Sequence, residues 1–113
     1  AWRVPEEKLD AVTALSGSGP AYFFAFIEAL AKGGAKLGLD EELAQELAVQ
    51  TMAGATEMLL QGKGTPGELR VAVTSKGGTT AAALDVMKTH GFDGMVQELL
   101  EAACKRSIEL GRS

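Results

Sequence analysis

Apolar residues recur through most of the chain at intervals of three and four, the spacing of one face of an α-helix. The final segment shows this most clearly, with apolar positions at Phe92, Val96, Leu100 and Cys104 and charged residues on the opposite face. The pattern predicts an all-α protein of about six helices and no sheet. We expect these helices at about 5–15, 21–37, 41–61, 65–73 and 79–88, and from Phe92 onward.

Helix start and stop signals separate these segments. Asp40 is a typical N-cap residue, and Thr65-Pro66-Gly67-Glu68 has the sequence of a capping box with proline in the first turn. Ser16-Gly17-Ser18-Gly19-Pro20 predicts a turn between the first two helices.

The segment 21–37 is apolar almost all round, which predicts a helix that needs cover on more than one side. With 113 residues the chain is long enough for one domain with its own core, but it leaves little to surround this helix. We therefore expect a second subunit to supply part of the cover. The alternative is the central helix of a monomer. Gly33 and Gly34 would let a neighbouring helix approach closely.

Composition excludes several classes of protein. A net charge of −4 and a pI near 5.0 argue against a nucleic-acid-binding face. One cysteine and one histidine are too few for a zinc-type site, so we expect no metal. The single cysteine, Cys104, cannot form an internal disulfide, which fits a protein of the reducing cytoplasm. Because Cys104 lies on an apolar stripe, we expect it to pack in the core. We see no signal peptide and no stretch that would span a membrane.

The candidate chemistry lies in Thr74–Thr80, where one helix is expected to end and another to begin. The first turn of a helix presents backbone N–H groups that favour an anion, and Gly77 and Gly78 would let a ligand come close. Hydroxyls of Ser75, Thr79 and Thr80 would add donors. The sequence thus predicts a pocket for a carboxylate or a phosphate. The alternative is purely structural: Thr79 or Thr80 is an N-cap, and the glycines end the preceding helix.

The Ser/Thr-rich glycine turn and the alanine-rich segment after it closely resemble the signature of pyrroline-5-carboxylate reductase. The resemblance runs from about Asp10 to Glu109 and includes Val12–Tyr22, Gly33-Gly34 and Gly91-Phe92. It implies that residues 1–113 form the C-terminal dimerisation and substrate-binding domain. That domain is of the 6-phosphogluconate-dehydrogenase-like helical type and interlocks as a homodimer; a larger ring of dimers is left open. The N-terminal Rossmann domain that binds NADPH or NADH is expected to be absent, so this chain alone should be inactive.

The resemblance also implies a reaction and roles for residues. The family reduces 1-pyrroline-5-carboxylate to L-proline in the last step of proline biosynthesis, in the cytoplasm. It places the substrate carboxylate on the Ser75 hydroxyl and on the N–H groups of Thr79 and Thr80, with the Thr80 hydroxyl reaching the ring nitrogen as the catalytic contact. Gly77 and Gly78 shape the turn, and Thr13 faces the cofactor. The sequence departs from some members at Lys76, where they have proline, and at Ala72, where they have asparagine.

Two other functions stay open on the sequence alone. One is a helical domain of another dehydrogenase with a catalytic lysine, for which Lys32, Lys36 and Lys88 are the candidates. The other is a free-standing helical dimerisation module without enzymatic activity.

Overall fold

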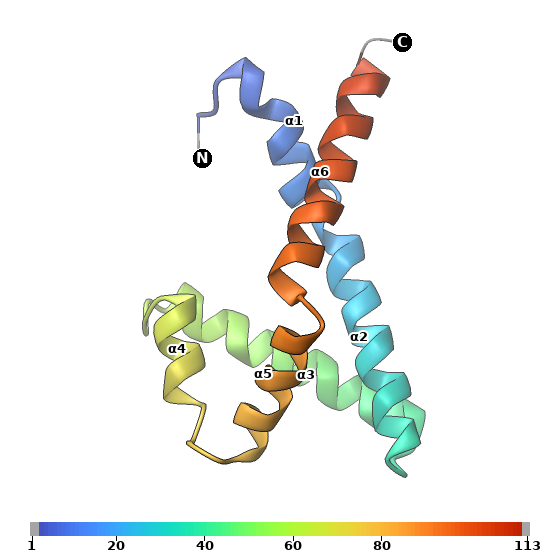
Figure 1. Ribbon diagram of the computed structural model, residues 1–113, viewed down its shortest axis with the longest axis vertical. Coiled ribbons are helices and arrows are strands. Elements are labelled where there is room, and N and C mark those ends of the chain that lie inside the picture. The colour runs from blue at the N-terminus through green and yellow to red at the C-terminus, as the bar shows by residue number, and fades with distance from the viewer. Residues whose placement is uncertain (1–2, 112–113) are drawn as a thin grey trace. The chain divides into compact units, whose positions relative to one another are not determined.

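The computed structural model describes residues 3–111, and within them the regular structure is helical, with no strand. The prediction of an all-α fold is therefore confirmed. A 3₁₀ turn and a π-helical turn (the π-turn below) accompany six α-helices along the chain (Figure 1). In order they are η1 (Glu6–Lys8), α1 (Leu9–Val12), the π-turn η2 (Thr13–Gly17), α2 (Gly19–Lys36), α3 (Glu41–Leu60), α4 (Pro66–Ala72), α5 (Thr79–Thr89) and α6 (Phe92–Gly111).

The helices form two compact units rather than one. The first unit combines the residues up to Phe24 with those from Lys88 on, and the second is Ala25–Met87. In the first unit, α1 and the π-turn pack against α6 (Figure 1). The Ser107 hydroxyl on α6 donates to Oδ1 of Asp10 on α1 at 2.7 Å, which ties the two ends of the sequence together.

The first helical segment differs from its prediction. A single helix over 5–15 followed by a turn at Ser16 was expected. The chain instead passes from η1 to the short α1, and then through the π-turn, which continues to Gly17. The Ser18 amide donates to the Thr13 carbonyl at 2.9 Å, a bond of the five-residue π type. Helix α2 then begins at Gly19, with Pro20 in its first turn.

In the second unit, a very close contact joins α2 to α3. A Cβ atom placed on Gly34 would lie 2.8 Å from the Cβ of Ala44, a distance that real side chains do not tolerate. The prediction of a close approach at the glycine pair is thus confirmed at Gly34, whereas a Cβ on Gly33 would meet nothing within 4 Å. The linker supports this contact: Gly38 has a φ of +103°, and the Asp40 side chain caps α3 by accepting from the Leu43 amide, as predicted.

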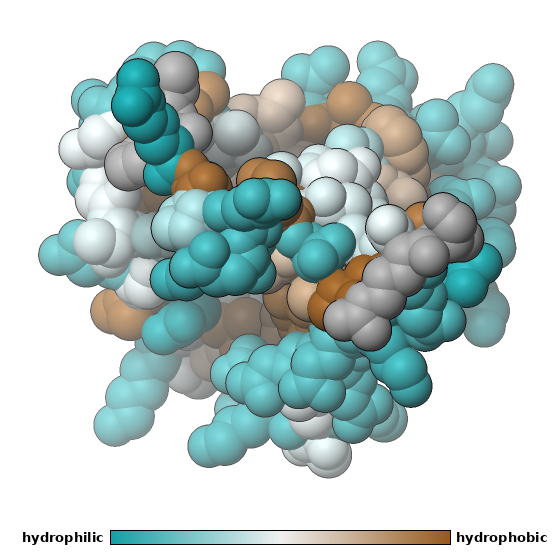
Figure 2. All heavy atoms as spheres, turned by 90° about the horizontal axis from the view of Figure 1, so that it is seen from above, coloured by the Kyte–Doolittle hydropathy of each residue, from teal (hydrophilic) through white to brown (hydrophobic). Residues whose placement is uncertain are grey.

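Small residues fill the interior and large apolar ones remain outside. The buried apolar residues of the described chain are four alanines: Ala14, Ala31, Ala44 and Ala48. Phe23, Phe24 and Leu37 on and after α2 are 58%, 66% and 88% exposed. Figure 2 shows apolar side chains reaching the surface between hydrophilic ones. Neither unit has enough chain to enclose these side chains, so the apolar helix 21–37 lacks the cover that its sequence demands.

Alanine substitutions at Gly34 and Gly33 should separate two effects on the free energy of unfolding: the cost of the close contact with Ala44, and the higher helix propensity of alanine. Gly34→Ala forces a methyl group against Ala44, and overpacking of this kind costs about 1–3 kcal/mol. Gly33→Ala is the matched control, because it adds the same methyl group to the same helix in open space. Urea unfolding should find Gly34→Ala the less stable variant by about that amount. Equal stability of the two variants would contradict the close contact.

Candidate functional site

The segment between α4 and α5 joins the two short helices (Figure 1) and is held by hydrogen bonds at each of its ends. Helix α4 ends where the Val73 amide bonds the Leu69 carbonyl at 3.2 Å and the Thr74 amide bonds the Val71 carbonyl at 3.0 Å. The Thr74 hydroxyl donates to the Arg70 carbonyl. Together these bonds satisfy carbonyls that a helix end would otherwise leave without partners. The chain therefore enters the following turn from a fixed point. The prediction of a helix here, rather than a strand at Val71–Thr74, is confirmed.

A tight turn follows at Ser75–Gly78. The Gly78 amide donates to the Ser75 carbonyl at 3.0 Å, and Gly77 has a φ of +74°. A positive φ at the third residue but not at Lys76 is the geometry of a type II turn, which favours glycine. A Cβ on Gly78 would lie 3.3 Å from both the Cβ and the carbonyl oxygen of Ser75. Both glycines are therefore needed to fold Ser75 back toward the start of α5.

Helix α5 begins directly after this turn. The Ala82 amide donates to the Gly78 carbonyl at 3.2 Å, which makes Gly78 the residue that precedes the helix. The structural alternative that Thr79 or Thr80 is the N-cap is therefore wrong: they are the first two helical residues. In this position their amides have no acceptor within the helix and point out from its positive end. Thr79 and Ser75 are exposed, and Thr80 is half-buried.

The charge around this turn favours an anion. Lys76 is the only charged residue between Arg70 and Asp85 in the sequence. A ligand at the start of α5 would thus meet backbone donors, hydroxyl groups and one cation, with no carboxylate in the same segment to oppose a negative charge. The turn can bind a carboxylate with neutral donors, and it holds no strong acid or base of its own.

Thr13 belongs to a different unit from Ser75–Thr80. It is the first residue of the π-turn, is exposed, and lies in the first unit, whereas Ser75, Gly77, Gly78, Thr79 and Thr80 lie together in the second. The position of Thr13 next to a cofactor therefore stays a prediction. Lys32, Lys36 and Lys88, the candidates for a catalytic lysine, are all exposed helical residues.

Sequence reasoning missed one polar contact beside Thr13. The Tyr22 hydroxyl donates to the Ala14 carbonyl at 2.6 Å, across eight residues and in a partly buried position. The serines and glycines at 16–19 are typical of a turn and give no signal for this contact.

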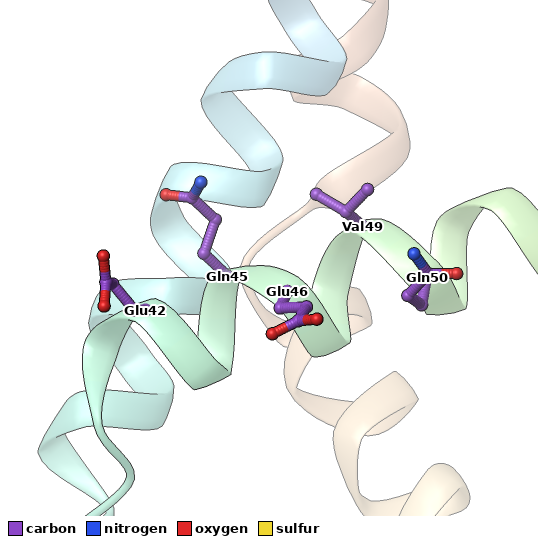
Figure 3. Close-up of a pocket in the computed structure, with 5 residues that line it drawn as sticks. All are labelled: Glu42, Gln45, Glu46, Val49 and Gln50. Atoms are coloured by element: carbon purple, nitrogen blue, oxygen red, sulfur yellow. The ribbon is translucent and has the colours of Figure 1, made fainter.

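Two hollows occur elsewhere on the second unit. One is an apolar groove between α2 and α3 whose lining includes Phe26, Leu30, Gly34, Leu47 and Met52. The other is a polar depression along α3. Figure 3 shows its lining residues on that one helix: Glu42, Gln45, Glu46, Val49 and Gln50. Its two carboxylates would repel an anionic ligand. Neither hollow includes Ser75–Thr80.

Within residues 3–111, no group of three or more His, Cys, Asp or Glu side chains is placed to hold a metal ion. Over the same residues, no helix combines the length and the apolar character needed to cross a membrane.

The fold and the turn together define a class of protein: an all-helical module that leaves large apolar side chains exposed and has a tight glycine turn at the start of a helix. The family described as pyrroline-5-carboxylate reductase dimerisation matches residues 6–110. The chain belongs to this family.

Similar proteins agree with this assignment. The chain is 49% identical over 109 residues to pyrroline-5-carboxylate reductase of Pseudomonas aeruginosa, covering 96% of the chain and 40% of that protein. It is 50% identical over 107 residues to pyrroline-5-carboxylate reductase 2 of Bacillus subtilis, covering 95% and 38%. The chain thus spans about two fifths of the length of these relatives.

Solved structures show the same fold. The Coxiella burnetii pyrroline-5-carboxylate reductase matches with a TM-score of 0.92 at 40% identity, over 96% of this chain and 40% of that one. The Plasmodium falciparum pyrroline carboxylate reductase, solved with NADP bound, matches with a TM-score of 0.91 at 38% identity, over 96% and 41%. Relatives of this kind favour a reductase domain over the alternative of another lysine-dependent dehydrogenase.

The capping box at the start of α4 predicts a pH dependence of stability. The Thr65 amide donates to Oε1 of Glu68 at 2.9 Å, and the Glu68 amide donates to the Thr65 hydroxyl at 3.1 Å, so the predicted box is confirmed. Two hydrogen bonds with Thr65 hold the pKa of the Glu68 carboxyl below its ordinary value. The bond with the Thr65 backbone has the larger effect, and the bond with the Thr65 side chain has the smaller one. Because the pKa of Glu68 is lowered only in the folded state, its ionised carboxylate stabilises the folded state at pH values above the pKa that Glu68 has in the unfolded chain. That contribution is lost as the pH falls through the folded pKa.

Glu68→Gln keeps an acceptor oxygen but cannot ionise. Acidification from about pH 5 to about pH 3 should therefore destabilise this variant less than the unmodified protein. Urea unfolding at a series of pH values measures the difference. Glu101→Gln, which changes an exposed acid on α6 outside any cap, serves as the control. A parallel pH dependence in Glu68→Gln and the unmodified protein would contradict the role of the ionised cap.

Proposed function

We propose that this chain is the helical part of a reductase that converts 1-pyrroline-5-carboxylate to L-proline with NADPH or NADH. The observation that carries the proposal is the type II turn at Ser75–Gly78, which leads directly into the start of α5. Family membership supports the same reaction, since relatives covering 96% of the chain are named for it.

The turn supplies the groups that a small cyclic carboxylate needs. The Ser75 hydroxyl and the amides of Thr79 and Thr80 would bind the carboxylate, because they are donors at the positive end of α5. Gly77 and Gly78 would let the ring approach the backbone. Lys76 would add a favourable charge beside the carboxylate without being required for it.

The chemical step needs little from this chain beyond position. A reduced nicotinamide would supply a hydride to the imine carbon of the substrate, which is already electrophilic. A proton taken up from water would go to the ring nitrogen, and the half-buried Thr80 hydroxyl would orient that nitrogen and relay the proton. Holding the carboxylate at one end and the nitrogen at the other fixes the ring for transfer, which is the main contribution that binding makes to such a reaction.

The cofactor would be held by a part of the protein outside this sequence. Residues 3–111 contain no strand and therefore no strand–glycine–helix loop of the kind that cradles a dinucleotide, so this chain would contribute only residues at the edge of the cofactor site. The chain covers about two fifths of its relatives, which leaves room for such a domain. The chain alone should accordingly be inactive. Thr13 would face the cofactor, and the protein would work in the cytoplasm, where the free thiol of Cys104 is stable.

The same proposal includes a homodimer. Phe23, Phe24 and Leu37 are more than half exposed, and obligate dimer interfaces bury large apolar side chains of this kind. The apolar groove between α2 and α3 is the natural place for a second copy, because it is lined by apolar residues.

Removal of the Thr80 hydroxyl tests the site. In the complete reductase, Thr80→Ala should lose an oriented hydrogen bond of about 1–3 kcal/mol, which lowers kcat/KM for the imine about ten- to a hundredfold. Thr89→Ala at the other end of α5 is the matched control and should keep the activity of the unmodified enzyme. Steady-state kinetics with 1-pyrroline-5-carboxylate gives both values.

A crystal of the complete enzyme soaked with L-proline provides an independent check. Its carboxylate should lie within hydrogen-bond distance of Ser75 and of the amides of Thr79 and Thr80. Density for proline elsewhere, with this turn empty, would rule out the assignment, as would unchanged kinetics in Thr80→Ala.

Assembly can be tested on the chain itself. Sedimentation equilibrium should give a mass of twice 11.8 kDa, or a multiple of that dimer if dimers join in a ring. A species of 11.8 kDa that retains the helical circular dichroism spectrum would show that the apolar faces need no second copy.

A further inference from the structure

In the π-turn one backbone carbonyl loses the amide donor that it would have in a regular α-helix, and the Tyr22 hydroxyl donates to that carbonyl instead. In an α-helix the Ser18 amide would donate to the Ala14 carbonyl, four residues earlier. Here it donates to the Thr13 carbonyl instead, at 2.9 Å. The Tyr22 hydroxyl, from the first turns of α2, donates to the Ala14 carbonyl at 2.6 Å. The phenol thus takes the position that the helix amide has left.

The surroundings of the Ala14 carbonyl make the hydrogen bond from Tyr22 important. Ala14 is 2% exposed, so its carbonyl lies where a missing donor would be costly. The residues before Ala14 are held by the hydrogen bond between Ser107 and Asp10 and by the packing of α1 and the π-turn on α6. A return to α-helical register would remove the extra residue from the turn, which corresponds to a rotation of about 100° between the two flanking segments. Since α1 is fixed on α6, Thr13–Gly17 would have to absorb that change.

Thr13 is the residue most directly affected. Its carbonyl accepts the displaced Ser18 amide, and a Cβ on Gly17 would lie 3.5 Å from the Cγ2 methyl of Thr13. The backbone of Thr13 is therefore part of the π register, while the residue as a whole remains exposed. Single π-turns within helices occur frequently at functional sites.

We propose that Tyr22 is a positioning residue for the reductase: by occupying the Ala14 carbonyl, its hydroxyl keeps the turn in π register and so holds Thr13 toward the nicotinamide cofactor. This inference rests on the proposed function, in which Thr13 faces the cofactor. Tyr22 itself touches neither cofactor nor substrate; it acts through the backbone of Ala14 and Thr13.

Tyr22→Phe in the complete reductase removes the hydroxyl and keeps the ring. We expect the KM for the nicotinamide cofactor to rise about two- to tenfold, the effect of one neutral hydrogen bond, with the KM for the imine unchanged. Thr89→Ala is the control: it deletes an exposed hydroxyl of the same unit, outside the π-turn and outside the contacts that hold it. It should leave both KM values unchanged.

A double-mutant cycle with Thr13→Val shows whether Tyr22 acts through Thr13. Valine retains the branched shape and removes the hydroxyl, so Tyr22→Phe should add no further loss in that background. An equal loss in both backgrounds would overturn the inference, and so would kinetics of Tyr22→Phe equal to those of the unmodified enzyme.

The crystal structure of Tyr22→Phe tests the register without reference to activity. The Ser18 amide should return to the Ala14 carbonyl; if it still bonds Thr13, Tyr22 does not set the register and the inference is wrong. These results are distinct from failure of the proposed function. An unmodified complete enzyme that does not reduce 1-pyrroline-5-carboxylate would overturn that function and, with it, the role given to Thr13.

Discussion

The close contact of Gly34 with Ala44 is the constraint on which the second unit depends. Two helices can approach this closely only where both carry almost no side chain. Alanine and glycine therefore occupy the contact, and the larger apolar residues are left on the outer faces of α2 and α3. The buried apolar residues of the described chain are likewise small, since all four are alanines. Close packing of helix backbones is achieved within the chain, while burial of large side chains is left to an association with another surface.

The conformation of the turn between α4 and α5 depends on the two short helices that flank it. Short helices on each side end and begin at fixed hydrogen bonds, so the few residues between them have little freedom. Gly77 supplies the positive φ and Gly78 the close approach, and Ser75 is thereby brought back toward the first amides of α5. The turn thereby presents backbone donors and hydroxyls at the start of α5.

Local signals in the sequence predicted local structure well. The caps at Asp40 and Thr65, the glycine turn before α5 and the apolar stripe of α6 each depend on residues within one or two turns of helix, and the structure agrees with them. The π-turn was not predicted, because it depends on a bond between Tyr22 and Ala14, eight residues apart, and on the packing of α6 from the far end of the sequence. The sequence placed Thr79 and Thr80 at the start of α5 but could not decide which residue precedes the helix. That choice followed from Gly78, whose carbonyl accepts the first helical bond.

The exposed faces of α2 have a consequence for the thermodynamics of this domain. Phenylalanines that are more than half exposed contribute little to the free energy of folding of a single chain. If they become buried only on association, folding and assembly form one equilibrium, and the melting temperature rises with protein concentration. Dilution would then favour unfolding in the same way as added urea, and a stability measured at one concentration could not be transferred to another.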